Sequence, residues 1–148
     1  MSEILPPKVG VGLFIVRGDE VLMGKRISKH GTGEFAGPGG HVDPGENPHE
    51  AVLREKSEEA GDDLQIGPLR MLCVSSLVRY LPKHYIDIGF AAEWVSGEPI
   101  VMEPEKLESW DWYPIDALPE PLFENIDKYV EAYRGGKMYF PHVTPEVE

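Results

Sequence analysis

Three glutamates, Glu55, Glu58 and Glu59, lie within five positions of one another. In a helix, which turns by about 100° per residue, their side chains would share an arc of roughly 100°. Carboxylates crowded in this way repel one another, and a divalent cation between them would relieve the repulsion. Oxygen ligands without Cys or His favour Mg²⁺ or Mn²⁺ over zinc, so the trio predicts a magnesium or manganese site. The alternative is a charged helix face that only water contacts.

A helix that begins at Pro48 and ends before Gly61 is expected to position these carboxylates. Asn47 can cap its first free N–H groups, Pro48 suits the first helical position, and Glu50 stands where a capping box places its acceptor. Gly61 is well placed to end the helix. The side opposite the carboxylates is predicted to pack, and it would consist of Leu53, Ser57, Ala60 and Leu64.

The stretch 40–62 follows a longer pattern: Gly40, five residues, Glu46, seven residues, Arg54-Glu55, then Glu58-Glu59 and Gly61. This spacing resembles the signature of the Nudix hydrolase superfamily, G-x5-E-x7-R-E-U-x-E-E-x-G-U, where U is a bulky apolar residue. All seven fixed positions agree, but Lys56 and Asp62 occupy the two U positions. We therefore expect rearranged packing behind the helix, with the Lys56 stem lying along the apolar side.

The resemblance implies a role for each matching residue. The metal ligands would be the Gly39 carbonyl and the carboxylates of Glu55, Glu58 and Glu59. Glu46 and Arg54 would form a salt bridge that fixes the loop against the helix. A further acidic residue, upstream of the strand that carries Trp110 and Trp112, would act as a ligand or base. Glu105 is the predicted residue, with Glu103 and Glu108 as alternatives, and the catalytic set would then be Glu58, Glu59 and Glu105.

Basic and aromatic residues near this stretch are candidates for substrate binding. Lys25, Arg26, Lys29 and His30 cluster in an otherwise acidic chain and could hold phosphate oxygens, or they could form an ordinary polar loop. Gly40 lets the backbone approach a metal or phosphate closely. Tyr85, like its neighbours Tyr80 and His84, could stack on a base or simply pack against a sheet. The predicted substrate-binding residues are Lys25, Arg26, Gly40 and Tyr85.

The rest of the chain alternates between strand and helix patterns. Residues 9–16 and 21–26 predict a β-hairpin, and residues 69–79 and 84–94 predict two further strands. Apolar residues at helical spacing from Leu122 to Tyr133 predict a packing helix that stops at Gly135. These mixed elements give an α/β protein, and the resemblance implies an α/β/α sandwich with a mixed central sheet.

Length and charge limit the kind of protein. A chain of 148 residues with 41% hydrophobic residues is the size of one domain, here expected to span 1–148. The net charge of −12 disfavours binding to a nucleic-acid polymer or an anionic membrane. The single cysteine, Cys73, forms no intramolecular disulfide, and no apolar run approaches the roughly 18 residues that span a bilayer. These features predict a cytoplasmic protein, and family habit suggests a possible homodimer.

The resemblance implies metal-dependent hydrolysis of a nucleoside diphosphate linked to another group X. It is strongest to the MutT-like branch, which converts nucleoside triphosphates to the monophosphate and pyrophosphate. ADP-ribose, ADP-sugars and dinucleoside polyphosphates are alternative small-molecule substrates. A nucleotide-binding regulator on the same fold is the non-enzyme alternative, but such proteins usually lack metal glutamates that are all present here.

Overall fold

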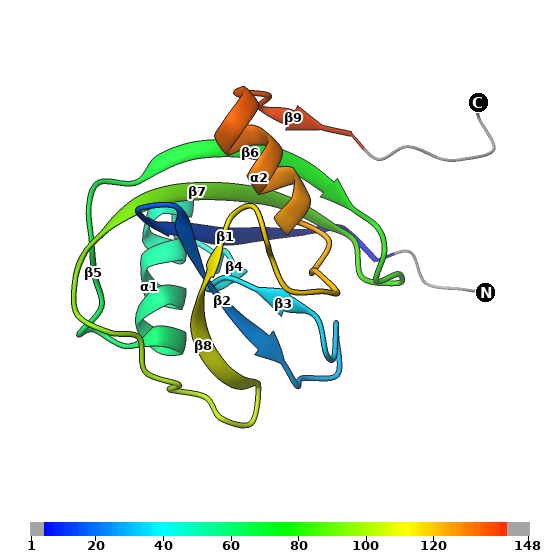
Figure 1. Ribbon diagram of the computed structural model, residues 1–148. Helices are drawn as coiled ribbons and strands as arrows, with labels where there is room; N and C mark the ends of the chain where they lie inside the picture. Colours follow the sequence, from blue (N-terminus) through cyan, green and yellow to red (C-terminus); the bar gives the residue numbers. More distant parts are fainter. Residues whose placement is uncertain (1–4, 142–148) are drawn as a thin grey trace.

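The computed structural model describes residues 5–141. The ends of the expected single domain, residues 1–4 and 142–148, lie outside the described residues. Along the chain the elements are β1 (Lys8–Arg17), β2 (Glu20–Arg26), β3 (Phe35–Ala36), β4 (Gly39–His41), α1 (Pro48–Ala60), β5 (Gln65–Ile66), β6 (Arg70–Leu77), β7 (Tyr85–Ser96), β8 (Leu107–Pro114), α2 (Ile126–Gly135) and β9 (Tyr139–Phe140) (Figure 1). The predicted hairpin, the two later strands and both helices are therefore confirmed.

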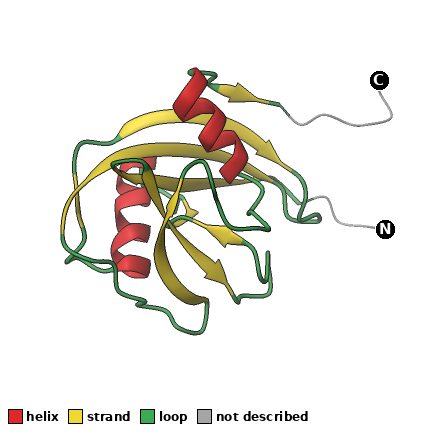
Figure 2. Cartoon of the chain, viewed as in Figure 1, coloured by secondary structure: helices red, strands yellow, loops and turns green. Residues whose placement is uncertain are grey.

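One mixed sheet contains the nine strands of the described residues, in the order β3-β2-β1-β7-β6-β9, with β4 paired to β1, β5 to β7 and β8 to β2. Strand β1 runs parallel to β7 and antiparallel to β2 and β4. Because β1 is central, its pairing with β4 holds the short strand that precedes α1 against the middle of the sheet. The sheet is drawn as yellow arrows in Figure 2.

Side chains of β1 alternate between two hydrophobic cores, one on each face of the sheet. Val11, Leu13 and Ile15 belong to the core that includes Ala51 and Val52 of α1. Phe14 and Val16 belong to the core that includes Ile126, Tyr129 and Ala132 of α2. This alternation is the period of two expected of a strand that is buried on both faces. The helices thus cover opposite faces, which confirms the predicted α/β/α arrangement (Figure 1).

Helix α1 begins as the sequence predicts. The Asn47 side chain accepts from the Glu50 N–H at 2.8 Å, and the Glu50 carboxylate accepts from the Asn47 N–H at 3.0 Å, which completes a capping box. Pro48 is the first helical residue, and Gly61 follows the last with φ at 87°, a conformation that favours glycine.

The packing side of α1 differs from the prediction. Its buried residues are Ala51, Val52, Lys56 and Ala60, whereas Leu53 is 45% exposed and Ser57 is partly exposed. The predicted packing roles of Leu53 and Ser57 were wrong because the helix rests on β4 and β1 with its acidic side turned inward. Glu55 is thus only 15% exposed, and the acidic and packing residues share one side. Lys56 is 7% exposed, so its stem is buried as expected.

We expect Asn47→Ala to lower the free energy of unfolding by about 1 kcal/mol, because the first turn of α1 would lose its side-chain acceptor. Thermal unfolding checks this, with a decrease in Tm of about 2–6 °C for a domain of this size. Asn47→Asp, which keeps an acceptor at the cap, is the matched control, and an Asn47→Ala Tm equal to that of the wild type would contradict the prediction.

Candidate active site

The turn formed by Gly39 and Gly40 in β4 brings the backbone close to two carboxylates of α1. The Gly39 N–H donates to Glu59 Oε1 at 2.7 Å, and the His41 N–H donates to Glu55 Oε2 at 3.2 Å. A Cβ at position 40 would lie 1.8 Å from Glu55 Oε2, so any larger residue there would push the Glu55 carboxylate out of this position. Glu55 and Glu59 thus both contact the backbone of residues 39–41, although a loop and the first turns of α1 separate them from it in the sequence.

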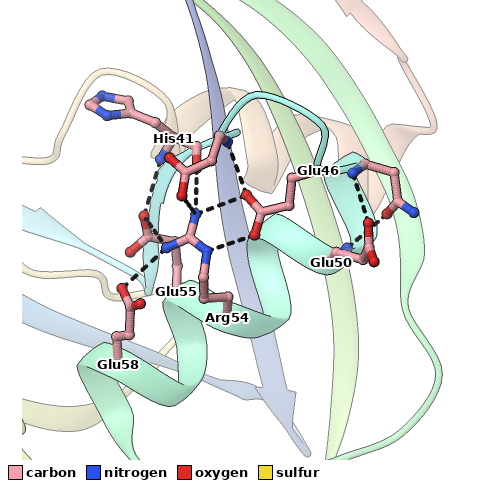
Figure 3. A network of polar contacts seen from close by, with 8 residues as sticks. His41, Glu46, Glu50, Arg54, Glu55 and Glu58 are labelled. Atoms are coloured by element: carbon pink, nitrogen blue, oxygen red, sulfur yellow. Dashed lines mark hydrogen bonds and ion pairs between the residues drawn. The ribbon is translucent and has the colours of Figure 1, made fainter.

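Arg54 organises the outer side of this region (Figure 3). Its Nε and Nη2 donate to the two carboxylate oxygens of Glu46 at 2.6 and 3.0 Å, and Nη2 also donates to the His41 carbonyl at 2.8 Å. The hydrogen bond from Arg54 lowers the pKa of Glu46 to about 2. This bidentate pair ties the loop before α1 to the helix, the position that the sequence assigns to the Glu46–Arg54 salt bridge.

Glu58 is more exposed than Glu55, and the two carboxylates share Arg54 Nη1, which lies 3.4 Å from Glu55 and 3.2 Å from Glu58. The Glu58 side chain is 49% exposed and accepts a hydrogen bond from this nitrogen. Within residues 5–141, no three His, Cys, Asp or Glu side chains are arranged closely enough to hold a metal ion. The structure therefore brings together Glu55, Glu59 and the Gly39 backbone, and places Glu58 with Arg54.

Glu55 and Glu59 fit a divalent cation because nothing in the protein compensates their buried charge fully. Burial raises the pKa of Glu59 to about 8, against the opposing effect of the Gly39 N–H, and burial also raises the pKa of Glu55. Each carboxylate raises the cost of ionising its neighbours. A hard cation held by these oxygens would favour the ionised form of both, which suits magnesium or manganese. Glu58 could join them only by leaving Arg54.

A pH dependence of stability follows from Glu59 in the absence of metal. Its folded pKa of about 8 exceeds the ordinary value of 4.5, so the stabilisation is complete below pH 4.5 and is lost as the pH rises through about 8. We expect urea unfolding with a chelator present to show stability falling over this range. Glu59→Gln should flatten the change, and an identical slope in both proteins would contradict the assignment.

A cavity of about 360 Å³ opens beside the two carboxylates. Gly39, Gly40, Arg26 and Tyr85 line it, as do Lys29, His30, Lys83 and Lys106. Lys25, the fourth predicted substrate-binding residue, does not line the cavity. Neighbouring side chains of a strand point to opposite faces, so β2 can turn only one of Lys25 and Arg26 toward it. The structure selects Arg26, whose pKa is lowered by burial, and corrects the prediction for Lys25.

Three acidic residues were considered from the sequence, Glu103 and Glu105 in the loop before β8 and Glu108 near the start of β8, and of these Glu103 lines the cavity. It is 27% exposed, forms an ion pair with Lys106 at 3.5 Å, and raises the cost of ionising Glu59. Glu105 and Glu108 are exposed and do not line the cavity. The geometry therefore favours Glu103, an alternative from the sequence, over Glu105. The loop folds back after Glu103, and no local pattern marks that turn.

Several cavity residues were not singled out as site residues from the sequence. The His41 ring stacks on the Tyr85 ring with centroids 5.3 Å apart. Deeper residues of the same cavity are Asp87, Phe123, Asn125 and Tyr129. Asp87 is the one charged residue in the first eight positions of β7, a signal that could have marked it. No sequence signal distinguishes Asn125 from an ordinary loop residue.

The model of the NUDIX domain family matches residues 6–133. The chain therefore belongs to the Nudix family, and the relatives described next are hydrolases of this family. Hydrolases of this family generally use divalent metal ions. In the described part of the chain, no helix is long and apolar enough to cross a membrane.

Two kinds of relative resemble the chain. The NAD-capped RNA hydrolase NudC of Stutzerimonas stutzeri is 33% identical over 131 residues, which are 87% of this chain and 45% of that protein. The chain spans less than half the length of the curated relatives described here, which include NudC of Pseudomonas syringae at 35% identity, 87% of this chain and 45% of that protein. The crystal structure of a MutT NUDIX hydrolase from Burkholderia pseudomallei is 34% identical, with a TM-score of 0.80 over 86% of this chain and 98% of that one.

Proposed function

We propose that this protein hydrolyses nucleoside triphosphates to the monophosphate and pyrophosphate, with Mg²⁺ or Mn²⁺ as cofactor. One observation carries the proposal: carboxylates and basic side chains meet in a single cavity of a strongly acidic protein. Glu55, Glu59 and Glu103 line that cavity together with Arg26, Lys29, Lys83 and Lys106. A polyphosphate needs both kinds of group, because cations bind through the carboxylates and the remaining phosphate oxygens need positive partners.

The size of the cavity and the solved relative support a substrate with one base. A volume of about 360 Å³ is near the lower end of the roughly 300–1,000 Å³ range of small-molecule sites. A single nucleotide fits this volume better than a dinucleotide does. The Burkholderia MutT NUDIX hydrolase, which this chain covers almost completely, is consistent with the MutT-like branch.

Each residue of the site has a proposed task. Glu55, Glu59 and the Gly39 carbonyl would hold the cation, with Glu58 joining if it leaves Arg54. When bound, the cation neutralises phosphate oxygens and lowers the pKa of water. Arg26 and Lys83 would bind phosphate oxygens, Gly40 would leave room for them, and Tyr85 would contact the nucleoside.

Glu103 would accept the proton of the attacking water as the anhydride link between the α- and β-phosphates breaks, and the leaving group would be pyrophosphate or the monophosphate, depending on which phosphorus is attacked. Glu46 and Arg54 would hold the loop before α1 in place.

A second candidate is the hydrolysis of a diphosphate that joins two nucleosides, as in NAD. It is favoured by the names of the relatives, which are NAD-capped RNA hydrolases with 33–35% identity to this chain. Because the chain matches only 45% of their length, their activity on RNA does not transfer directly. The net charge of −12 also favours a small nucleotide over an RNA polymer.

Incubation of the full chain with the common nucleoside triphosphates and Mg²⁺ tests the proposal. We expect release of pyrophosphate and monophosphate in equal amounts, and none with excess chelator. A parallel panel of NAD, ADP-ribose and a dinucleoside polyphosphate tests the other substrates. Faster hydrolysis of NAD than of every triphosphate would overturn the proposal in favour of the second candidate.

A further inference from the structure

Two of the residues that line the cavity have a buried polar atom without a hydrogen-bond partner. Among the residues that the structure describes, four buried side-chain polar atoms lack a partner: His30 Nε2, Ser75 Oγ, Trp112 Nε1 and Asn125 Oδ1. Of their residues, His30 and Asn125 line the cavity, whereas Ser75 and Trp112 do not. Leaving a buried polar group unpaired is costly, so atoms of this kind inside a cavity point to a ligand that pairs with them.

A chain of hydrogen bonds fixes which atom of Asn125 is left unpaired. The Tyr129 hydroxyl donates to Asp87 Oδ2, and Asn125 Nδ2 lies 3.2 Å from the Tyr129 oxygen. Burial raises the pKa of Asp87 only to about 6 and that of Tyr129 well above 10, so at pH 7 the carboxylate accepts and the phenol keeps its one proton. The phenol oxygen can then only accept from the amide, which leaves Asn125 Oδ1 as an acceptor with no donor.

The position of Tyr129 makes this chain rigid. Its ring lies against Gly12 of β1 and Gly89 of β7, and a Cβ at either glycine would collide with it. Tyr129 itself is 1% exposed. The acceptor of Asn125 is therefore held by the sheet and does not depend on a mobile loop.

The same end of the cavity has aromatic walls, and the Arg26 guanidinium lies 4.5 Å from the Phe123 ring centroid and donates to the His30 carbonyl. The His30 ring packs against Tyr80, Tyr85 and Phe123, with centroids 4.3, 5.7 and 5.6 Å away. Burial lowers the pKa of His30 to about 4, so the imidazole is neutral at pH 7. Beside Asn125, the carboxylate of Asp87 disfavours a phosphate group, and the neighbouring Phe123 ring favours a planar one.

We propose that Asn125, Asp87 and His30 form a nucleobase subsite that selects bases with an exocyclic amino group over bases with only keto groups. The amino N–H donates to Asn125 Oδ1, which a keto oxygen at the same position would repel. The inference rests on the proposed function for the identity of the ligand as a nucleotide. It adds the orientation of that nucleotide, with the base at Asn125 and the phosphates toward Glu55 and Glu59.

Binding of nucleoside monophosphates without metal tests the subsite separately from catalysis. CMP and UMP differ in amino against keto at one ring position, and so do AMP and IMP. By calorimetry with the full chain, we expect CMP to bind about 10- to 100-fold more tightly than UMP, and AMP than IMP by a similar factor. Equal affinities within either pair, tighter binding of the keto member, or no binding of any of the four would overturn the proposal.

Two variants assign the selection to the hydrogen-bond chain. Asn125→Leu removes the acceptor and should bring the CMP to UMP ratio to within threefold. Tyr129→Phe keeps the ring but frees the amide to turn, so it should also reduce the ratio, with Tyr129 acting as a positioning residue. Ser75→Ala is the matched control, because Ser75 also has an unpaired buried hydroxyl but lies outside the cavity.

Thermal unfolding of each variant shows whether it is folded, and if Tyr129→Phe is not, Asn125→Leu alone decides. A ratio of CMP to UMP affinity equal to that of the wild type in folded Asn125→Leu would overturn the subsite. Pyrophosphate release is measured separately. CMP-selective binding without triphosphate hydrolysis would contradict the proposed function but support the subsite. Triphosphate hydrolysis without base selection would support the proposed function but contradict the subsite.

Discussion

Replacement of Glu59 by Gln is expected to lower kcat for nucleoside triphosphate hydrolysis by about 100- to 1,000-fold. Glu59 accepts a hydrogen bond of 2.7 Å from the Gly39 N–H, and burial raises its pKa to about 8. Gln preserves the shape and can keep this hydrogen bond, but it cannot carry the negative charge that would hold a cation. The measurement is pyrophosphate release at saturating substrate and Mg²⁺.

Glu50→Gln is the control for this variant, because it makes the same chemical change on the same helix, at an exposed capping residue outside the cavity. It should retain nearly full activity. Isothermal titration with Mg²⁺ should show weaker uptake by Glu59→Gln. If Glu59→Gln turned over like the wild type, the assignment of this residue would be refuted.

The effect of Glu58→Gln on kcat shows whether Glu58, the third carboxylate of the trio, contributes to cation binding. If Glu58 leaves Arg54 to bind the cation, as the family pattern implies, the loss should reach about 100-fold. A much smaller loss would mean that Glu58 remains with Arg54, where its distance to Nη1 is 3.2 Å.

Glu103→Gln is expected to lower kcat by about 100-fold or more, a typical loss when a general base is removed. Glu103 lines the cavity and lies near enough to Glu59 to affect its ionisation. Since its task would be to accept a proton from water, the loss should be in kcat more than in KM. Initial rates over a range of substrate concentrations separate the two constants.

Glu105→Gln in the same loop and Glu108→Gln in β8 are the matched controls, because both side chains are exposed and lie outside the cavity. We expect both to keep wild-type turnover. A large loss in Glu105→Gln with full activity in Glu103→Gln would restore the choice made from the sequence and show that the loop moves when substrate binds.

What could be predicted from the sequence concerns interactions between residues close together in the chain. The start of α1 at Pro48 depends on Asn47 and Glu50, which lie within one turn of it. The hairpin of β1 and β2 depends on a short turn between two apolar runs. The family pattern is likewise contained in residues 40–62, so its recognition needed no knowledge of the fold.

Only the tertiary structure decided which side of each element faces the site. Helical periodicity placed Glu55 and Glu59 on one side, but it could not show that this side is buried against β4 while Leu53 is 45% exposed. Strand alternation implied that Lys25 and Arg26 point to opposite faces of β2, but it could not show which of them lines the cavity. Asn125 and His30 come from segments about 95 residues apart, and Glu103 from a third.

The physical reason is that local geometry fixes the relative directions of neighbouring side chains. Their absolute directions depend on packing between elements that are distant in the chain. The sequence by itself therefore determined the helix, its carboxylates and the family, and the packed sheet decided which of these carboxylates, cations and amides share one cavity.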